Sequence, residues 1–169
     1  MKKDLAIIGG LFVVIIVLVI FGQGFTSGGF LSGPTSPKTA TRSAALAGTI
    51  PVTVKSLNVS ATVATTPDQR KKGLANLDSL PLNSAMLFVF DQKDSYAIWM
   101  KDMRFAIDII WIDENKKIVD IAQNVAPEPK KKDRELTVYR PKADAKYVLE
   151  VNAGLASLNG LVLGDPVQF

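Results

Sequence analysis

Six side chains in this sequence have types and positions that could support binding or catalysis. They are one aromatic residue and five charged residues, in or beside apolar segments: Arg70, Trp99, Lys101, Asp102, Asp108 and Glu150. Asp108 and Glu150 interrupt runs of apolar residues, and a folded chain tolerates such charges where they pair or line a polar cleft. We therefore expect these residues to gather in one region, as a candidate binding cluster.

The two carboxylates have two alternative roles. Asp108 and Glu150 could face one cleft, where they would act as acid and base or bind a hard cation such as Ca²⁺ or Mg²⁺. They could instead be structural, paired with Arg70 or Lys101 or accepting hydrogen bonds from loop amides. We predict no defined metal site and no cofactor, and the choice between the two roles stays open.

Trp99 and Lys101 suggest a binding platform, because residues two apart on a strand share a face. The indole ring could stack on a sugar or a base, and the ammonium group could bind an anion. In the alternative interpretation Trp99 belongs to the core and Lys101 extends past it to solvent.

The composition excludes several kinds of chemistry. The chain of 169 residues contains no Cys and no His, which removes thiolate and imidazole catalysis and any zinc site that needs these ligands. The formal net charge is +4, but the residues after Gly48 hold sixteen basic and fifteen acidic side chains. A nucleic-acid-binding domain should carry a basic face, so we predict no nucleic-acid partner.

The N-terminal region predicts a membrane anchor. Leu5 to Phe21 is an uncharged run of seventeen residues, and the positions that follow can extend it to the ~30 Å of a bilayer core. We predict a transmembrane anchor over residues 5–25 in the lipid bilayer, with residues 1–4 in the cytoplasm because Lys2 and Lys3 precede the run. A cleaved signal peptide is the alternative. The predicted location is the cell membrane, single-pass, with the C-terminal domain extracytoplasmic.

Beyond the anchor, the chain divides into a tether and a domain. Residues 26–48 are rich in Gly, Ser, Thr and Pro, which predicts a flexible linker. Residues 49–169 alternate apolar and polar positions and predict an α+β domain. Thr66, Pro67 and Gln69 mark a helix start with a capping box, and the helix should end at Lys72.

The strongest strand signals lie between Met86 and Ile112. Three short strands are predicted there, at 86–90, 96–101 and 105–112, because the apolar pieces are short, separated by polar residues and rich in Ile, Val, Phe and Trp. Further strands are expected at 117–122 and 147–151, and a second short helix at 153–159. The predicted fold is a small strand-rich α+β domain with a mainly antiparallel sheet or a partly closed barrel and two short helices.

An ordered set of short motifs resembles a known family. The motifs are Arg70-x-x-Gly73-Leu74, Met86-Leu87-Phe88-Val89-Phe90, Trp99-Met100-Lys101, the strand with Asp108, Leu149-Glu150, Gly154, Gly160 and Gly164-Asp165-x-Val167. Together they resemble the domain of unknown function 192 family over roughly Val59 to Phe169. The resemblance implies a small strand-rich α+β domain, often exported or membrane-tethered in prokaryotes, and no established reaction.

This chain also departs from the family pattern at three places. Ala85 stands where the family usually has Gly, and Ala106 where it usually has Pro. Asp102-Met103 replaces a common Asn-Thr pair after the Trp-Met-Lys motif. If that pair contacts a ligand in the family, the contact is altered here.

Two classes of function are compatible with these features. The first is an extracytoplasmic binding or accessory module for an envelope polymer, a small ligand or a membrane protein. The second is a hydrolase or lyase that uses carboxylate and Lys chemistry on an envelope saccharide. The tether, the absence of His and the absence of a recognised catalytic motif favour the first class.

Overall fold

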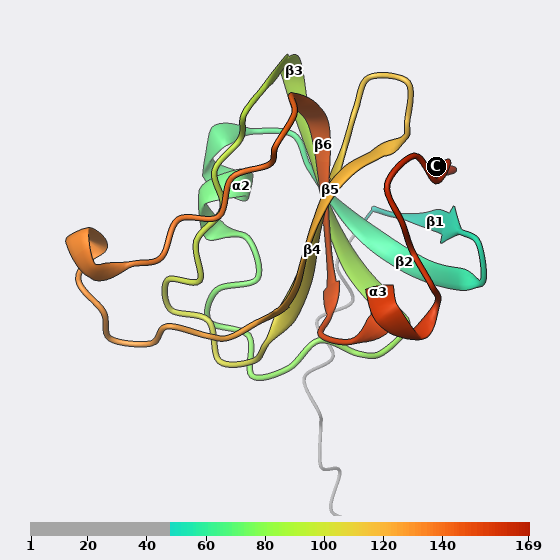
Figure 1. Ribbon diagram of the computed structural model, residues 1–169. Coiled ribbons are helices and arrows are strands. Elements are labelled where there is room, and N and C mark those ends of the chain that lie inside the picture. The colour runs from blue at the N-terminus through green and yellow to red at the C-terminus, as the bar shows by residue number, and fades with distance from the viewer. Residues whose placement is uncertain (1–47) are drawn as a thin grey trace, which may run out of the picture. The chain divides into compact units, whose positions relative to one another are not determined.

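A six-stranded sheet organises the part of the chain that the computed structural model describes, residues 48–169 (Figure 1). The strands are β1 (Thr49–Val54), β2 (Leu57–Ala64), β3 (Ser84–Asp94), β4 (Ile107–Ile112), β5 (Ile118–Val125) and β6 (Ala145–Asn152). Their order across the sheet is β1-β2-β3-β6-β4-β5. β2 and β3 run parallel, and the other neighbours are antiparallel. The sheet is therefore mixed, and because it is not closed, the alternative prediction of a partly closed barrel is wrong.

The predicted anchor over 5–25 lies outside the described residues, as does almost all of the predicted linker over 26–48. Within residues 48–169, no helix has the length and apolar character needed to cross a membrane.

Local signals predicted the first helix correctly. α2 (Pro67–Lys72) begins at Thr66, whose side chain accepts a hydrogen bond from the Gln69 backbone N–H. The Gln69 side chain accepts in return from the Thr66 N–H at 3.0 Å, which completes the capping box. Gly73 ends the helix with a φ of 47°, a backbone conformation that glycine adopts without steric cost. The second predicted helix is shorter than expected and forms α3 (Leu155–Leu158), and a single 3₁₀ turn, η1 (Asp133–Glu135), lies in the preceding loop region.

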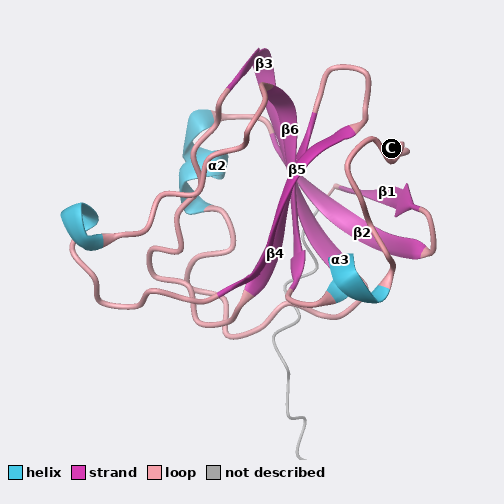
Figure 2. Cartoon of the chain, in the orientation of Figure 1, coloured by secondary structure: helices cyan, strands magenta, loops and turns pink. Residues whose placement is uncertain are grey.

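The predicted strand over 96–101 is wrong, because this segment is a loop (Figure 2). β3 already pairs with β2 on one side and β6 on the other, so the chain that leaves β3 has no free sheet edge beside it. A turn follows, in which the Tyr96 N–H donates to the Asp94 carbonyl at 3.0 Å. The segment then crosses a face of the sheet, and its backbone pairs with other loops in isolated bridges, such as Ile98 with Tyr139.

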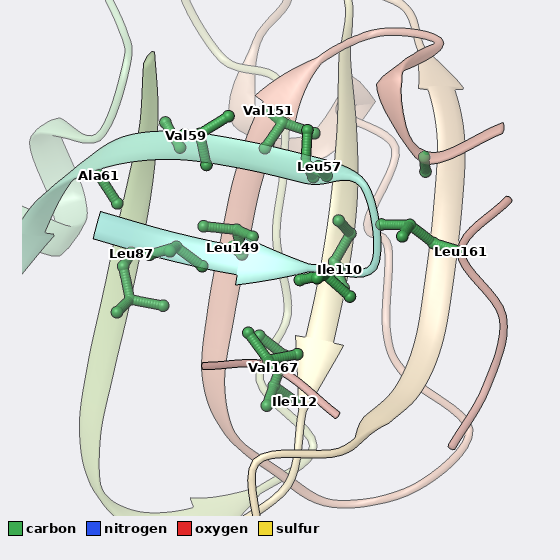
Figure 3. Close-up of a cluster of buried hydrophobic side chains, with 14 of the residues drawn as sticks. Leu57, Val59, Ala61, Leu87, Ile110, Ile112, Leu149, Val151, Leu161 and Val167 are labelled. Carbon is green, nitrogen blue, oxygen red and sulfur yellow. The ribbon is translucent and has the colours of Figure 1, made fainter. Parts of the chain in front are cut away.

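The two faces of the sheet carry separate apolar clusters. One cluster fills the space between the β1–β2 hairpin and the inner strands, and the C-terminal segment adds Leu161 and Val167 (Figure 3). The other lies under α2 and the loops, and includes Leu74, Met100 and Trp111. Because both faces are covered, all six residues of β4 are buried.

The C-terminal segment bridges the two edges of the sheet. Gln168 exchanges two backbone hydrogen bonds of 2.9 Å with Thr53 of β1. The Val167 N–H donates to Lys116 at 2.8 Å, and the Asp165 carbonyl accepts from Ile118 of β5 at 3.0 Å. Both edge strands are thus partly occupied by residues 165–168.

Candidate functional site

A pocket of about 410 Å³ lies between α2, the 96–101 segment and the sheet face that carries Glu150. We call this cavity the inner pocket. Its lining is largely apolar and includes Leu74, Phe88, Met100, Met103 and Ile107, with basic side chains from α2. A second hollow of about 430 Å³ adjoins it and shares Lys71, Lys72, Ala75, Trp99 and Lys101. We call this second cavity the outer hollow.

Glu150 supplies a carboxyl group to the inner pocket. Its side chain shares a sheet face with Met86 of β3 and Ile109 of β4, its cross-strand partners, and the residue is 5% exposed. Within residues 48–169 no group donates a hydrogen bond to this carboxyl, although every fully enclosed polar side-chain atom there has a partner. The Glu150 oxygens therefore still touch the open space of the pocket. Burial disfavours the charged form and raises the pKa of Glu150 to about 8.

Asp108 lies on the opposite face of the sheet and does not line the inner pocket. Its carboxylate accepts three backbone hydrogen bonds, from Asn124 at 2.8 Å, Gly154 at 3.1 Å and Ala156 at 2.8 Å. The residue is fully buried, and these amides hold the end of β5 and the start of α3 to β4. This is the arrangement of the structural alternative with loop amides, and no contact joins Asp108 to Arg70 among the described residues.

Arg70 belongs to an ordered stack at the edge of the inner pocket. Its Nη1 donates to the Thr65 carbonyl and to the Val89 carbonyl at 3.0 Å, so α2 is fastened to β3. The guanidinium lies over the Phe90 ring at 4.9 Å, and Phe90 stacks on Tyr96 with 3.5 Å between ring centroids. The Nη1 donor group of Arg70 is thus directed at backbone carbonyls of its own chain.

Trp99 and Lys101 lie on the wall between the inner pocket and the outer hollow. Trp99 is 50% exposed, so it is a surface ring and not a core residue. Lys101 pairs with Asp133 of η1 at 2.5 Å, which ties this wall to the loop beyond it. Hydrogen bonding to Asp133 raises the pKa of Lys101.

Asp102 occupies a turn beside the outer hollow. Its φ of 56° is left-handed, a conformation that Asn and Asp tolerate better than most residues, and its carbonyl accepts from Asn76 at 3.3 Å. Four of the six candidate residues therefore line the inner pocket: Arg70, Trp99, Lys101 and Glu150. Asp102 lines the outer hollow and not the inner pocket, and Asp108 lines neither cavity.

Sequence reasoning missed the aromatic pair Phe90 and Tyr96, which forms part of the pocket lining. It also missed Trp111, whose buried indole N–H donates to the Tyr96 carbonyl at 2.9 Å and fixes the start of the pocket wall. The sequence does contain a signal for this pair, because Phe90 and Tyr96 stand on either side of the polar segment 91–95. Among the described residues, no three carboxylates lie close enough together to hold a metal ion.

Comparisons with other proteins agree with the family resemblance. Residues 50–169 match the family DUF192, described as an uncharacterized ACR. A UPF0127 protein of Thermococcus gammatolerans is 29% identical over 103 residues, which are 60% of this chain. The matched region also spans 60% of that relative's length.

Two solved structures are similar to this chain. A protein of unknown function from Novosphingobium aromaticivorans DSM 12444 has a TM-score of 0.65 and 24% identity, over 86% of this chain and 99% of the other. A protein from Sinorhizobium meliloti 1021 has a TM-score of 0.64 and 24% identity, over 72% of this chain and 93% of the other. At this level of identity, the likeness concerns the fold alone. The family match covers well over half of the sequence, and the chain accordingly belongs to DUF192, a family of unknown function.

Proposed function

We propose that this domain is a binding module that takes a small organic ligand into the inner pocket. One observation carries the proposal: Glu150 is a buried carboxyl group that opens into a pocket and receives no hydrogen bond from the described residues. Because the Glu150 oxygens touch the open space of the pocket, a ligand that enters the pocket can form a hydrogen bond with this carboxyl group. The neutral acid present below about pH 8 can donate to a carbonyl or hydroxyl oxygen.

The rest of the pocket defines the remainder of the ligand. Met100, Met103 and Ile107 favour an apolar portion near Glu150. Lys71 and Lys72 at the mouth make no ion pair within residues 48–169, so the mouth favours a negatively charged group. The expected ligand is therefore amphipathic, with an uncharged acceptor at its buried end.

A thermal-shift screen of a fragment library tests this proposal, because a ligand that binds only the native state raises the unfolding temperature. The full chain in mild detergent is screened near pH 6.5, and each hit is measured again on Glu150→Gln, Glu150→Leu and Glu135→Gln. Glu150→Gln keeps a hydrogen-bond donor and should retain binding, whereas Glu150→Leu should weaken it by about tenfold or more. Glu135→Gln, an exposed position on η1, is the control. Hits that bind all four proteins equally would contradict the proposal.

A second candidate is an enzyme that uses Glu150 as a general acid. A pKa of about 8 lies in the range suited to proton donation near neutral pH. Asp108 faces the other side of the sheet, so a hydrolase with this pair of carboxylates is not supported by the geometry. A lyase or hydrolase acting on an envelope saccharide would use Glu150 as its only pocket carboxyl among the described residues, with Lys101 on the pocket wall. Turnover of an oligosaccharide panel by the wild type and its loss in Glu150→Gln, with binding retained, would favour this candidate.

We also propose that residues 5–25 tether the domain outside the cytoplasmic membrane. The uncharged run of seventeen residues and the preceding Lys2 and Lys3 support this orientation. An envelope polymer or a membrane protein would then supply the ligand. Reporter fusions after Phe169 test the topology: a periplasm-active reporter is expected to be active and a cytoplasm-active reporter silent, and the reverse result would contradict the tether.

A further inference from the structure

The wall of the inner pocket contains a stretch of backbone, residues 97–99, that is hydrogen-bonded on one side. Ile98 exchanges two hydrogen bonds of 2.9 Å with Tyr139, one through its N–H and one through its carbonyl. The main-chain N–H and C=O groups of its neighbours Ala97 and Trp99 form no hydrogen bond with any other group within residues 48–169. Alternate residues of a strand direct their N–H and C=O groups to opposite sides. The segment 97–99 therefore has one paired side and one open side.

Ala97 and Trp99 both line the inner pocket, so a ligand in this pocket lies beside the segment. We propose that the ligand is an extended, acidic peptide segment, which binds as an added strand along Ala97 and Trp99. This inference rests on the proposed binding function of the pocket and names the class of ligand. Main-chain hydrogen bonds supply affinity in such strand addition, and pockets for alternate side chains supply specificity.

Side-chain chemistry on both sides of this stretch fits a peptide. In an extended peptide every second side chain points the same way, so one can enter the floor formed by Met100, Met103 and Glu150. A side chain with a carbonyl oxygen, such as that of Gln or Asn, can accept from Glu150 and donate back to it. The adjacent side chains lie near the mouth, where the cations Lys71 and Lys72 favour acidic residues.

The half-exposed Trp99 ring is consistent with the same ligand. Its indole stands between the inner pocket and the outer hollow, so a strand that pairs with the Trp99 main chain would continue past this ring. Aromatic rings at such positions bury large area at low entropic cost. The outer hollow then receives the next residues of the peptide.

Blocked peptides provide the test. Three pools of N-acetylated, C-amidated pentapeptides are used, each with Gln, Asn, Leu or Met at the centre: an acidic pool, a basic pool, and an acidic pool with N-methylated backbone amides. Binding to the ¹⁵N-labelled full chain in mild detergent is followed through the amide signals of Ala97 and Trp99. N-acetylleucine methylamide serves as a small amide probe of the pocket itself.

The acidic pool should shift both amide signals, and it should bind about tenfold or more tightly than the basic and the N-methylated pools. Ala97→Pro removes one main-chain donor and should weaken the acidic pool by a similar factor, whereas Ala143→Pro, on an exposed loop outside both cavities, should not. If Ala97→Pro does not fold, the N-methylated pool on the wild type makes the same test. Equal binding of the acidic and N-methylated pools, or binding that leaves Ala97 and Trp99 unshifted, overturns the inference. If the small amide probe binds and no peptide pool binds, the peptide inference is wrong and the proposed binding function of the pocket stands. If neither the probe nor any pool binds, both proposals are wrong.

Discussion

Asp108 of β4 and Glu150 of β6 lie on adjacent strands, one step apart in register, and their side chains point to opposite faces of the sheet. Asp108 is paired with Val151, and Glu150 with Ile109. This single step decides their roles, because one carboxyl meets three backbone amides and the other meets a pocket. The two carboxyl groups therefore act independently.

Replacing Asp108 should destabilise the domain. Asp108→Asn puts an NH₂ group where an oxygen now accepts from loop amides, so at least one buried N–H loses its partner. We expect a loss of roughly 2–4 kcal/mol in the free energy of unfolding, measured by urea denaturation. Asp78→Asn is the matched control, because Asp78 is an exposed carboxylate whose ion-pair partner within residues 48–169 is Arg104; it should change stability by less than about 1 kcal/mol. Equal effects of the two substitutions would show that the amide contacts do not matter.

Replacing Glu150 should have an effect on stability that depends on pH. The pKa of this buried carboxyl is about 8 in the folded protein, against an ordinary value of 4.5. Because the pKa of Glu150 is higher in the folded protein, the contribution of Glu150 to stability is fully present below about pH 4.5 and is lost as the pH rises through about 8. Glu150→Gln does not titrate and should become more stable than the wild type, by an upper limit of about 4 kcal/mol near pH 8 and by little near pH 4.5. Urea denaturation across this range measures the difference; one that stays constant with pH would rule out a raised pKa.

Trp111 should hold the pocket wall in place. Trp111→Phe keeps a large buried ring but leaves the Tyr96 carbonyl without its donor. We expect a loss of roughly 1–3 kcal/mol in stability and faster hydrogen exchange at the amides of Ile98 and Tyr139. Hydrogen exchange by NMR measures the second effect. Unchanged exchange at both amides would mean that the wall does not depend on this bond.

Hydrogen bonds to Glu128 should hold the loop that contains η1 in its folded conformation. It accepts hydrogen bonds from Lys131 and from both the N–H and the hydroxyl of Thr137, and these donors lower its pKa to about 2. Since the folded-state pKa is the lowered one, this contribution to stability is present above about pH 4.5 and is lost as the pH falls through about 2. The amide shift of Thr137 should follow that titration.

Limited proteolysis tests the same loop at neutral pH. Glu128→Gln should accelerate tryptic cleavage after residues 130–132 several-fold, because the loop opens more often. Glu114→Gln, an exposed carboxylate outside this loop, is the control. Similar cleavage rates for the two variants would assign no special role to Glu128.

Features that depend on neighbouring residues could be predicted from the sequence. The capping box of Thr66 and Gln69 is one, since all its atoms lie within one turn. The prediction of a strand at 96–101 was wrong because strand propensity does not say which sheet edges are free. Both edges of β3 are occupied by other strands. The prediction that Asp108 and Glu150 lie together was wrong for a related reason. The sheet face that each side chain occupies follows from the pairing of strands more than forty residues apart, and no local pattern specifies that register.

The bridging C-terminal segment sets an order of events during synthesis. Thr49–Val54 leaves the ribosome early, but its hydrogen bonds to Gln168 cannot form until more than one hundred further residues have been made. Until then β1 and β5 expose edges that other chains can pair with, so a nascent or truncated chain lacking residues 165–168 is the form most prone to aggregate. A released chain that ends just before Asp165 would therefore form a domain with its six strands in place and both edges of the sheet unprotected.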